Sequence, residues 1–193
     1  MYNINTNERL EKQAQTDGSF MERNGKGYIS HYVSPLGNIT LGSDGEHLTG
    51  LWFDGQRHFA ETLGENCEEK EIPVFVLTKK WLDIYFTGKE PGFRPKVEIR
   101  ASEFQRQVLA ILSDIPYGHT VTYGKIAEKI ASERGIPKMS ARAVGNAVGR
   151  NPVSLIIPCH RVIRSVGYPG EYAGGAERKA KLLELEGALR YDH

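Results

Sequence analysis

Residues 140–164 read SARAVGNAVGRNPVSLIIPCHRVIR, and the helix and turn signals in this stretch decide how the second half of the chain folds. Ser140 is a helix N-cap residue type, so a short helix of small residues is expected to follow it. Asn151-Pro152 should end that helix, because the residue before a proline disfavours the helical conformation. The Asn-Pro and Ile-Pro pairs then predict an irregular turn that carries Cys159.

Helical patterns also surround this stretch. Apolar residues recur at helical spacing and Gly/Pro pairs separate the runs, which predicts four helices in the second half. They are expected over residues 102–113, 123–134, 140–150 and 174–187. The second and third of these helices, joined by a short turn, have the proportions of a helix-turn-helix.

The first half has a different pattern. Short β-branched and aromatic runs, separated by Pro-Leu-Gly and Ser-Asp-Gly turn signals, predict an antiparallel meander followed by one helix. The strands are expected over residues 28–33, 37–42 and 47–53, and the helix over 73–87. We therefore predict an α+β protein with a mobile polar tail at 1–24, a sheet-and-helix domain at 25–95 and a helical domain at 96–193.

Composition bounds the class of protein. Hydrophobic residues make up 39% and charged residues 25% of the 193, which is typical of a globular chain. The sequence contains no apolar run long enough to span a bilayer, so no membrane association is expected, and its polar N-terminus does not resemble a signal peptide. These features predict a cytoplasmic protein. The two cysteines, Cys67 and Cys159, suggest neither a disulfide framework nor a zinc site, and Cys67 lies in an acidic stretch that disfavours a thiolate.

Positive charge is concentrated in the second half. Residues 100–193 contain 14 Lys/Arg against 9 Asp/Glu, whereas residues 1–99 contain 11 against 15. Such a concentration suits a surface that binds phosphate groups, as nucleic-acid-binding proteins have. The alternative is a solvated basic face with no partner.

The helix after Ser140 contains Gly145 and Gly149, each of which costs about 1 kcal/mol relative to alanine. Small side chains allow a backbone to approach another surface closely. That surface is either the core of the protein or a groove of DNA. The nearby Arg142 and Arg150 favour the groove, because they can pair with phosphates or bases.

Cys159 can be either a small buried residue or a nucleophile. A nucleophilic cysteine reacts as a thiolate, so it needs a lowered pKa or a nearby base. In an irregular turn the adjacent His160 can approach the thiol directly or through one water, and Arg161 and Arg164 add positive potential. The turn by itself leaves both alternatives open.

The segments NPVSLIIPCHRVI, GEYAGGAERKAKLLELEG, YGHTVTYGKIA and SARAVGNAVGRNP resemble the O6-alkylguanine-DNA alkyltransferases, the methylated-DNA–protein-cysteine methyltransferases. YVSPLGNITLGSDGEHLTGLWF resembles the amino-terminal domain of that family less specifically. The resemblance implies a ribonuclease H-like first domain and a winged-helix-like DNA-binding second domain. It also implies a DNA-repair activity without a cofactor, in which the alkyl group of O6-alkylguanine, or of O4-alkylthymine, moves to a cysteine that is used once.

The resemblance assigns catalytic roles to five residues. Cys159 would accept the alkyl group, and His160 would take its proton through a water. Glu186 would orient the imidazole, and Asn151 would hold the turn that presents the thiol. Tyr123 would help to extrude the nucleotide and would donate a proton to the leaving guanine.

The resemblance also implies that the protein binds the minor groove of double-stranded DNA as a monomer. Arg142 would enter the base stack in place of the flipped base. The further DNA-binding residues would be Tyr123, Thr122, Ser140, Ala141, Ala143, Gly145 and Arg150. The base pocket would comprise Val162, Tyr172, Ala173 and Gly174. Many relatives have serine at the position of Ala173, which puts the substrate range in doubt. The loop at 131–139 is slightly longer than in the shorter members.

Some relatives bind zinc in the amino-terminal domain. The present sequence has no cysteine before Cys67, so no metal site is predicted there.

Two other functions compete with this reading. A non-catalytic sensor of alkylated DNA would also need the basic helix, but such relatives replace the cysteine, often with tryptophan. A Cys-His-Glu thiol hydrolase would need the thiol but neither Arg142 nor the glycine-rich helix. DNA affinity that falls steeply with salt would count against the hydrolase.

Overall fold

The computed structural model describes residues 26–64, 66–164 and 169–188. The tail predicted at residues 1–24 lies outside the described residues. In the part of the chain that is described, no helix is both long and apolar enough to cross a membrane.

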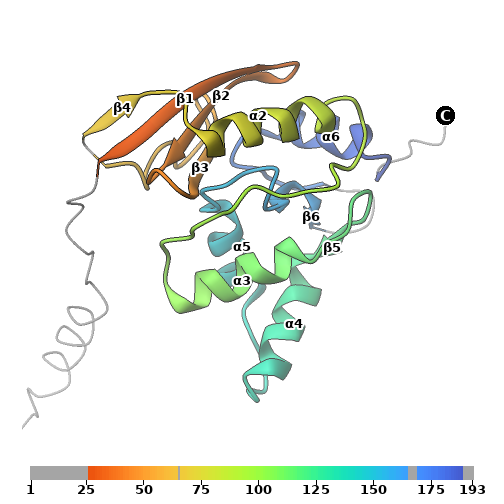
Figure 1. Cartoon of the computed structure of the whole chain (residues 1–193). Helices are drawn as coiled ribbons and strands as arrows, with labels where there is room; N and C mark the ends of the chain where they lie inside the picture. The colour runs from red at the N-terminus through yellow and green to blue at the C-terminus, as the bar shows by residue number, and fades with distance from the viewer. Residues whose placement is uncertain (1–25, 65, 165–168, 189–193) are drawn as a thin grey trace, which may run out of the picture.

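The first half forms a four-stranded sheet with one helix against it (Figure 1). The strand order is β3-β2-β1-β4, and the bounds are β1 Gly27–Ser34, β2 Gly37–Ser43, β3 Leu48–Phe53 and β4 Cys67–Glu69. The first three strands pair antiparallel, as predicted, whereas β4 pairs in parallel with the start of β1. Helix α2, Pro73–Tyr85, ends two residues earlier than predicted.

The sheet needs a glycine where a tryptophan lies over it. A Cβ atom at Gly50 would stand only 1.7 Å from the ring of Trp52. Gly50 therefore lets the indole, which is 1% exposed, lie flat along its own strand.

The second half is mainly helical. Its elements are α3 Glu103–Ser113, β5 Val121–Thr122, α4 Tyr123–Glu133, α5 Ala141–Gly149, the 3₁₀ turn η1 Cys159–Arg161, β6 Val162–Ile163 and α6 Ala176–Leu185. Side chains cap three of the helices, because Ser102, Thr122 and Ser140 accept hydrogen bonds from the backbone N–H groups of Gln105, Lys125 and Ala143. The caps predicted at Ser102 and Ser140 are confirmed. Helix α6 begins after Gly175, which has a φ of +96° that glycine adopts without strain.

Strand β3 joins the two halves. On one side of it, Leu48 N donates to Lys96 O at 2.8 Å, so the connecting segment runs beside the strand. Further along, Leu51 N donates to Pro152 O at 2.8 Å and Ser154 N donates to Leu51 O at 3.0 Å. The turn that precedes Cys159 is therefore docked by backbone hydrogen bonds onto the sheet of the first half, and one continuous cluster of buried side chains extends through both halves.

Candidate active site

Asn151 holds the turn that carries Cys159. Its Nδ2 donates to Ile157 O at 2.8 Å and to Cys159 Sγ at 3.1 Å, while its Oδ1 accepts from Val153 N at 3.1 Å. Within the turn, Leu155 adopts a φ of +69°, a left-handed conformation that costs a leucine about 1–3 kcal/mol. The buried amide of Asn151 thus stabilises a strained backbone whose effect is to point the thiol at a fixed position.

The thiol of Cys159 is only 4% exposed. Burial raises its pKa, while the hydrogen bond from Asn151 and the charge of Lys179 oppose that rise. Because burial is the largest of these effects, the resting cysteine is a neutral thiol that needs a base before it can react.

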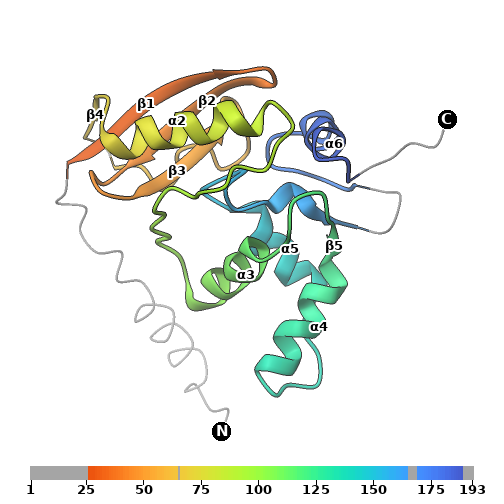
Figure 2. The same cartoon turned by 45° about the vertical axis from the view of Figure 1, so that its right-hand side comes forward.

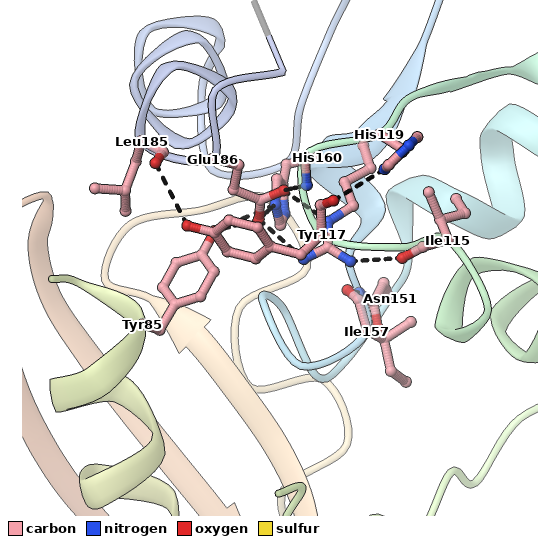
Figure 3. A network of polar contacts seen from close by, with 11 residues as sticks. Tyr85, Ile115, Tyr117, His119, Asn151, Ile157, His160, Leu185 and Glu186 are labelled. Atoms are coloured by element: carbon pink, nitrogen blue, oxygen red, sulfur yellow. Dashed lines mark hydrogen bonds and ion pairs between the residues drawn. The ribbon is translucent and has the colours of Figure 1, made fainter. Parts of the chain in front are cut away.

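His160 is completely buried and lies against Glu186 (Figure 3). Its Nε2 is 2.7 Å from Glu186 Oε1, and its Nδ1 has no hydrogen-bond partner among the described residues. An ionised carboxylate only accepts, so the ring proton is on Nε2 and Nδ1 carries the free lone pair. Burial lowers the pKa of His160, while the hydrogen bond and charge of Glu186 oppose this. The imidazole is therefore a neutral base.

Glu186 accepts hydrogen bonds from several directions. Arg161 donates from Nε to Oε2 at 2.8 Å and from Nη2 to Oε1 at 3.0 Å. Tyr85 donates its hydroxyl to Oε1 at 2.7 Å, and Gly118 N donates to Oε2 at 3.3 Å. Burial would raise the pKa of Glu186, but the hydrogen bonds and charges of His160 and Arg161 lower it to about 2. The group stays ionised at any physiological pH.

The position of Arg161 corrects one expectation. The sequence suggested that Arg161 adds positive potential at the thiol, but its guanidinium is buried, pairs with Glu186 and donates from Nη1 to Ile115 O at 2.6 Å. A residue that follows His160 in a 3₁₀ turn projects in a different direction from Cys159, so its charge is used behind the histidine.

Sequence reasoning missed Lys179. This lysine is fully buried, and its Nζ donates to Val162 O at 2.5 Å and to Glu171 O at 3.2 Å. Burial lowers its pKa to about 8, and the charge of Cys159 opposes that change. A signal was present: Lys179 lies three and four positions before Leu182 and Leu183, on the buried side of the helix.

Helix α5 faces the protein core on one side and solvent on the other. Its buried residues are Val144, Ala147 and Val148, which face the core. On the other side Ala141, Arg142 and Arg150 are exposed. At Gly145 a Cβ would lie 3.8 Å from the ring of Tyr123, so the helix runs close beneath that ring. Tyr123 is half-buried, and both burial and the charge of Cys159 raise the pKa of its phenol.

The structure brings three of the four predicted pocket residues into the buried interior. Val162 and Gly174 are buried, Tyr172 is 7% exposed and Ala173 is half-buried. A Cβ at Gly174 would come within 2.7 Å of the Tyr172 ring, so a larger residue at this position would clash with the ring as it is placed. Ala173 O accepts from Arg57 N at 3.0 Å, which attaches this segment to the first half. Among the described residues, no group of three or more His, Cys, Asp or Glu side chains is placed to hold a metal ion.

The fold and the site define a class of protein in which a buried thiol, backed by a histidine–glutamate pair, lies beside a basic helix pair. Residues 28–99 match the family described as "6-O-methylguanine DNA methyltransferase, ribonuclease-like domain", and residues 103–188 match its "DNA binding domain". The chain belongs to the methylated-DNA–protein-cysteine methyltransferase family, as its motifs suggested, and the predicted two-part α+β fold is confirmed.

Relatives match over nearly their whole length. The methylated-DNA–protein-cysteine methyltransferase of Methanosarcina acetivorans is 40% identical over 161 residues, which cover 83% of this chain and 99% of that protein. The protein of the same name from Mycobacterium leprae is 40% identical over 153 residues, with 79% and 88% covered. A Mycobacterium tuberculosis relative, solved in complex with DNA, has a TM-score of 0.68 at 36% identity and covers 84% of this chain and 93% of that one.

Proposed function

We propose that Cys159 is the residue of this chain that accepts an alkyl group from O6-alkylguanine in DNA, and that each molecule acts once. As a member of its family, the chain carries out DNA repair by suicide transfer of a methyl group from O6-methylguanine to a cysteine. The single observation that carries the assignment is the pairing of a buried thiol at Cys159 with an adjacent neutral imidazole whose Nδ1 is free.

The proposed reaction begins with the base. His160 Nδ1 takes the proton of Cys159 through one water, and the ionised Glu186 stabilises the imidazolium that forms. The thiolate then attacks the alkyl carbon, so that the sulfur–carbon bond forms as the bond from carbon to guanine O6 breaks. Guanine leaves with the electron pair of that bond. Tyr123 donates a proton to it, and the proton on His160 restores the phenol by way of solvent, so the net change moves the thiol proton to guanine.

The thioether explains why the protein is used once. Asn151 Nδ2 donates to Cys159 Sγ at 3.1 Å, and a neutral amide does not remove an alkyl group from sulfur. A thioether is stable to water, so the alkylated sulfur is not regenerated.

The alkylated guanine can reach Cys159 only if its nucleotide leaves the stacked bases of the DNA duplex, which costs a few kcal/mol. The chain binds damaged DNA. We propose that α5 enters the minor groove of duplex DNA and that Arg142, which is exposed on its outer face, fills the space left by the flipped base. The small residues Ala141, Ala143 and Gly145 would permit close approach to the groove, and Arg150 would pair with a phosphate. Thr122 and Ser140 would contribute from the two helix N-termini, where backbone N–H groups favour phosphate.

The pocket for the flipped base would be lined by Val162, Tyr172, Ala173 and Gly174. Ala173 lacks the hydroxyl that many relatives have, so its backbone N–H would be the donor to O6. We propose O6-alkylguanine as the principal substrate and O4-alkylthymine as a second one.

Three further proposals concern the whole chain. We propose that the domain boundary lies at residues 95 and 96, in the segment that connects α2 to α3. We propose that the protein acts as a monomer, because every residue of the site comes from one chain. A cytoplasmic location is supported by the reactive thiol, which needs a reducing compartment.

Mass spectrometry tests the assignment of Cys159. After incubation of the reduced protein with a duplex containing O6-methylguanine, the intact mass should rise by one methyl group, located in the peptide that contains Cys159. Cys159→Ser should take up nothing, while Cys67→Ser, the matched control at the other cysteine, should be methylated like the unaltered chain. An unchanged mass, or a methyl group on Cys67, would refute the proposal, and full repair by Cys159→Ala would favour a damage sensor.

A further inference from the structure

Tyr85 brings the first half of the molecule into the site. It is the last residue of α2, it is fully buried, and it lies 101 positions before Glu186 in the sequence. Its hydroxyl donates to Glu186 Oε1 at 2.7 Å and is 3.3 Å from His160 Nε2 (Figure 3). In both Figure 1 and Figure 2 the C-terminal end of α2, which carries Tyr85, points toward α6.

The ring of Tyr85 is fixed by its neighbours. It stacks on Trp81 with centroids 5.0 Å apart and planes 10° apart, and it meets Phe86 and Tyr117 edge-on at 5.4 and 6.2 Å. Aromatic contacts on several sides leave the phenol little freedom to turn. The hydroxyl is therefore held at one place relative to Glu186 by packing within the first half and at its border.

The proton on this hydroxyl determines where the other protons are. Burial and then the charge of Glu186 raise the pKa of Tyr85 well above 10, so the phenol remains protonated and donates. Its one proton goes to Oε1, where His160 Nε2 also donates at 2.7 Å. Because the phenol gives its one proton to Oε1, it does not donate to Nε2, so Nε2 keeps its own hydrogen toward Glu186 and Nδ1 remains the basic nitrogen.

We propose that Tyr85 is a positioning residue for alkyl transfer: its hydroxyl holds Glu186 Oε1 against His160 Nε2 and keeps the ring proton there, so that Nδ1 is the base. This inference rests on the proposed role of His160. Tyr85 itself touches neither the thiol nor the substrate and acts only through Glu186 and His160.

Removal of the hydroxyl should change the basicity of His160 in a known direction. The groups that face the imidazole are the anion Glu186, the cations Arg161 and Lys179, and the hydroxyl of Tyr85. Without that hydroxyl, Oε1 has only His160 and Arg161 as donors, so more of its negative charge is available to the imidazolium. The protonated ring is then favoured, and the pKa of His160 rises.

Tyr85→Phe removes only one oxygen atom and tests this directly. We would measure the rate of methyl transfer from methylated duplex as a function of pH. In Tyr85→Phe, the acidic limb of this profile should lie about half to one pH unit higher than in the unaltered chain. Tyr117→Phe is the matched control, because Tyr117 lies beside Tyr85 but donates to the backbone oxygen of Leu185. Its acidic limb should stay in place. A limb unmoved in Tyr85→Phe, with only a uniform loss of rate, would show a merely structural tyrosine and overturn the proposal.

Histidine ¹⁵N NMR provides a second test, which does not require the Tyr85→Phe substitution. In the resting unaltered protein, the signal that disappears in His160→Asn should show hydrogen on Nε2 and none on Nδ1. The opposite tautomer would overturn the proposal. Failure of the unaltered chain to take up a methyl group would instead refute the proposed function.

Discussion

The two sides of the Cys159–His160 pair are built in opposite ways. On the histidine side, five hydrogen bonds from His160, Arg161, Tyr85 and Gly118 converge on the carboxylate of Glu186. On the thiol side, Asn151 donates a neutral hydrogen bond to Sγ at 3.1 Å, and burial raises the pKa of the thiol. Under the proposed function, this difference means that the base is held in place by its partners, while the nucleophile stays neutral until it is needed.

This asymmetry suits a residue that is used once. A resting thiolate would react with any soft electrophile that reached it, because the thiolate is the reactive form of cysteine. A neutral thiol with a positioned base reacts only when a substrate carbon stands in line to receive the sulfur. The comparison predicts a larger loss of stability from changes on the histidine side than from changes on the thiol side.

The largest effect is expected from Glu186→Ala. The change leaves Arg161 buried without its carboxylate, and truncation of one partner of a buried ion pair costs about 3–5 kcal/mol. Urea unfolding should show that loss. Glu184→Ala removes an exposed carboxylate two residues away and should change the free energy of unfolding by less than about 0.5 kcal/mol. Equal effects of the two substitutions would show that the network contributes nothing.

Low pH should destabilise the histidine side of the site without any substitution. The pKa of Glu186 is lowered to about 2 in the folded protein from its ordinary value of 4.5, so its contribution is present above pH 4.5 and is lost as the pH falls toward 2. By linkage the full loss is about 3 kcal/mol, and about 2 kcal/mol of it should have occurred by pH 3. His160, whose pKa is lowered from 6.5, adds a loss of stability that begins as the pH falls below that value. Urea unfolding between pH 7 and 3 measures both, and a flat profile over this range would contradict the prediction.

Asn151→Ala tests the thiol side. The substitution removes the hydrogen bonds to Ile157 O and Cys159 Sγ, so we expect a loss of about 2 kcal/mol in stability and a fall of about 10-fold in the rate of a single turnover. Asn38→Ala, at an exposed position of β2, is the control and should leave both quantities unchanged. A rate equal to that of the unaltered chain would mean that Asn151 does not present the thiol.

Much of the fold followed from local signals. The three antiparallel strands, the caps at Ser102 and Ser140, and the end of α5 before Asn151-Pro152 agree with the expectations. Strand β4 was not predicted. Cys67–Glu69 has three residues, acidic composition and a parallel partner in β1, so no alternation or hairpin turn marks it.

The geometry of the candidate site was predictable where its residues are neighbours in sequence or stand in a family motif. Cys159, His160 and Asn151 lie within one turn, and the structure places Glu186 against His160, as the resemblance implied. Tyr85 and Lys179 were not predicted as part of it. Each occupies a helix position that would be read as ordinary packing or as surface charge, and each acquires its role from a partner in another element.

By itself, the sequence determined the elements and the chemistry of the turn, because caps, glycine breaks and Asn-Pro pairs act over a few residues. Only the tertiary structure decided how that chemistry is controlled. It turned Arg161 away from the thiol toward Glu186, and it brought the phenol of Tyr85 across 101 positions to the same carboxylate. The physical reason is that a buried carboxylate must be satisfied by whichever donors the packing of β3, α2 and α6 brings to it, and no local pattern specifies those donors.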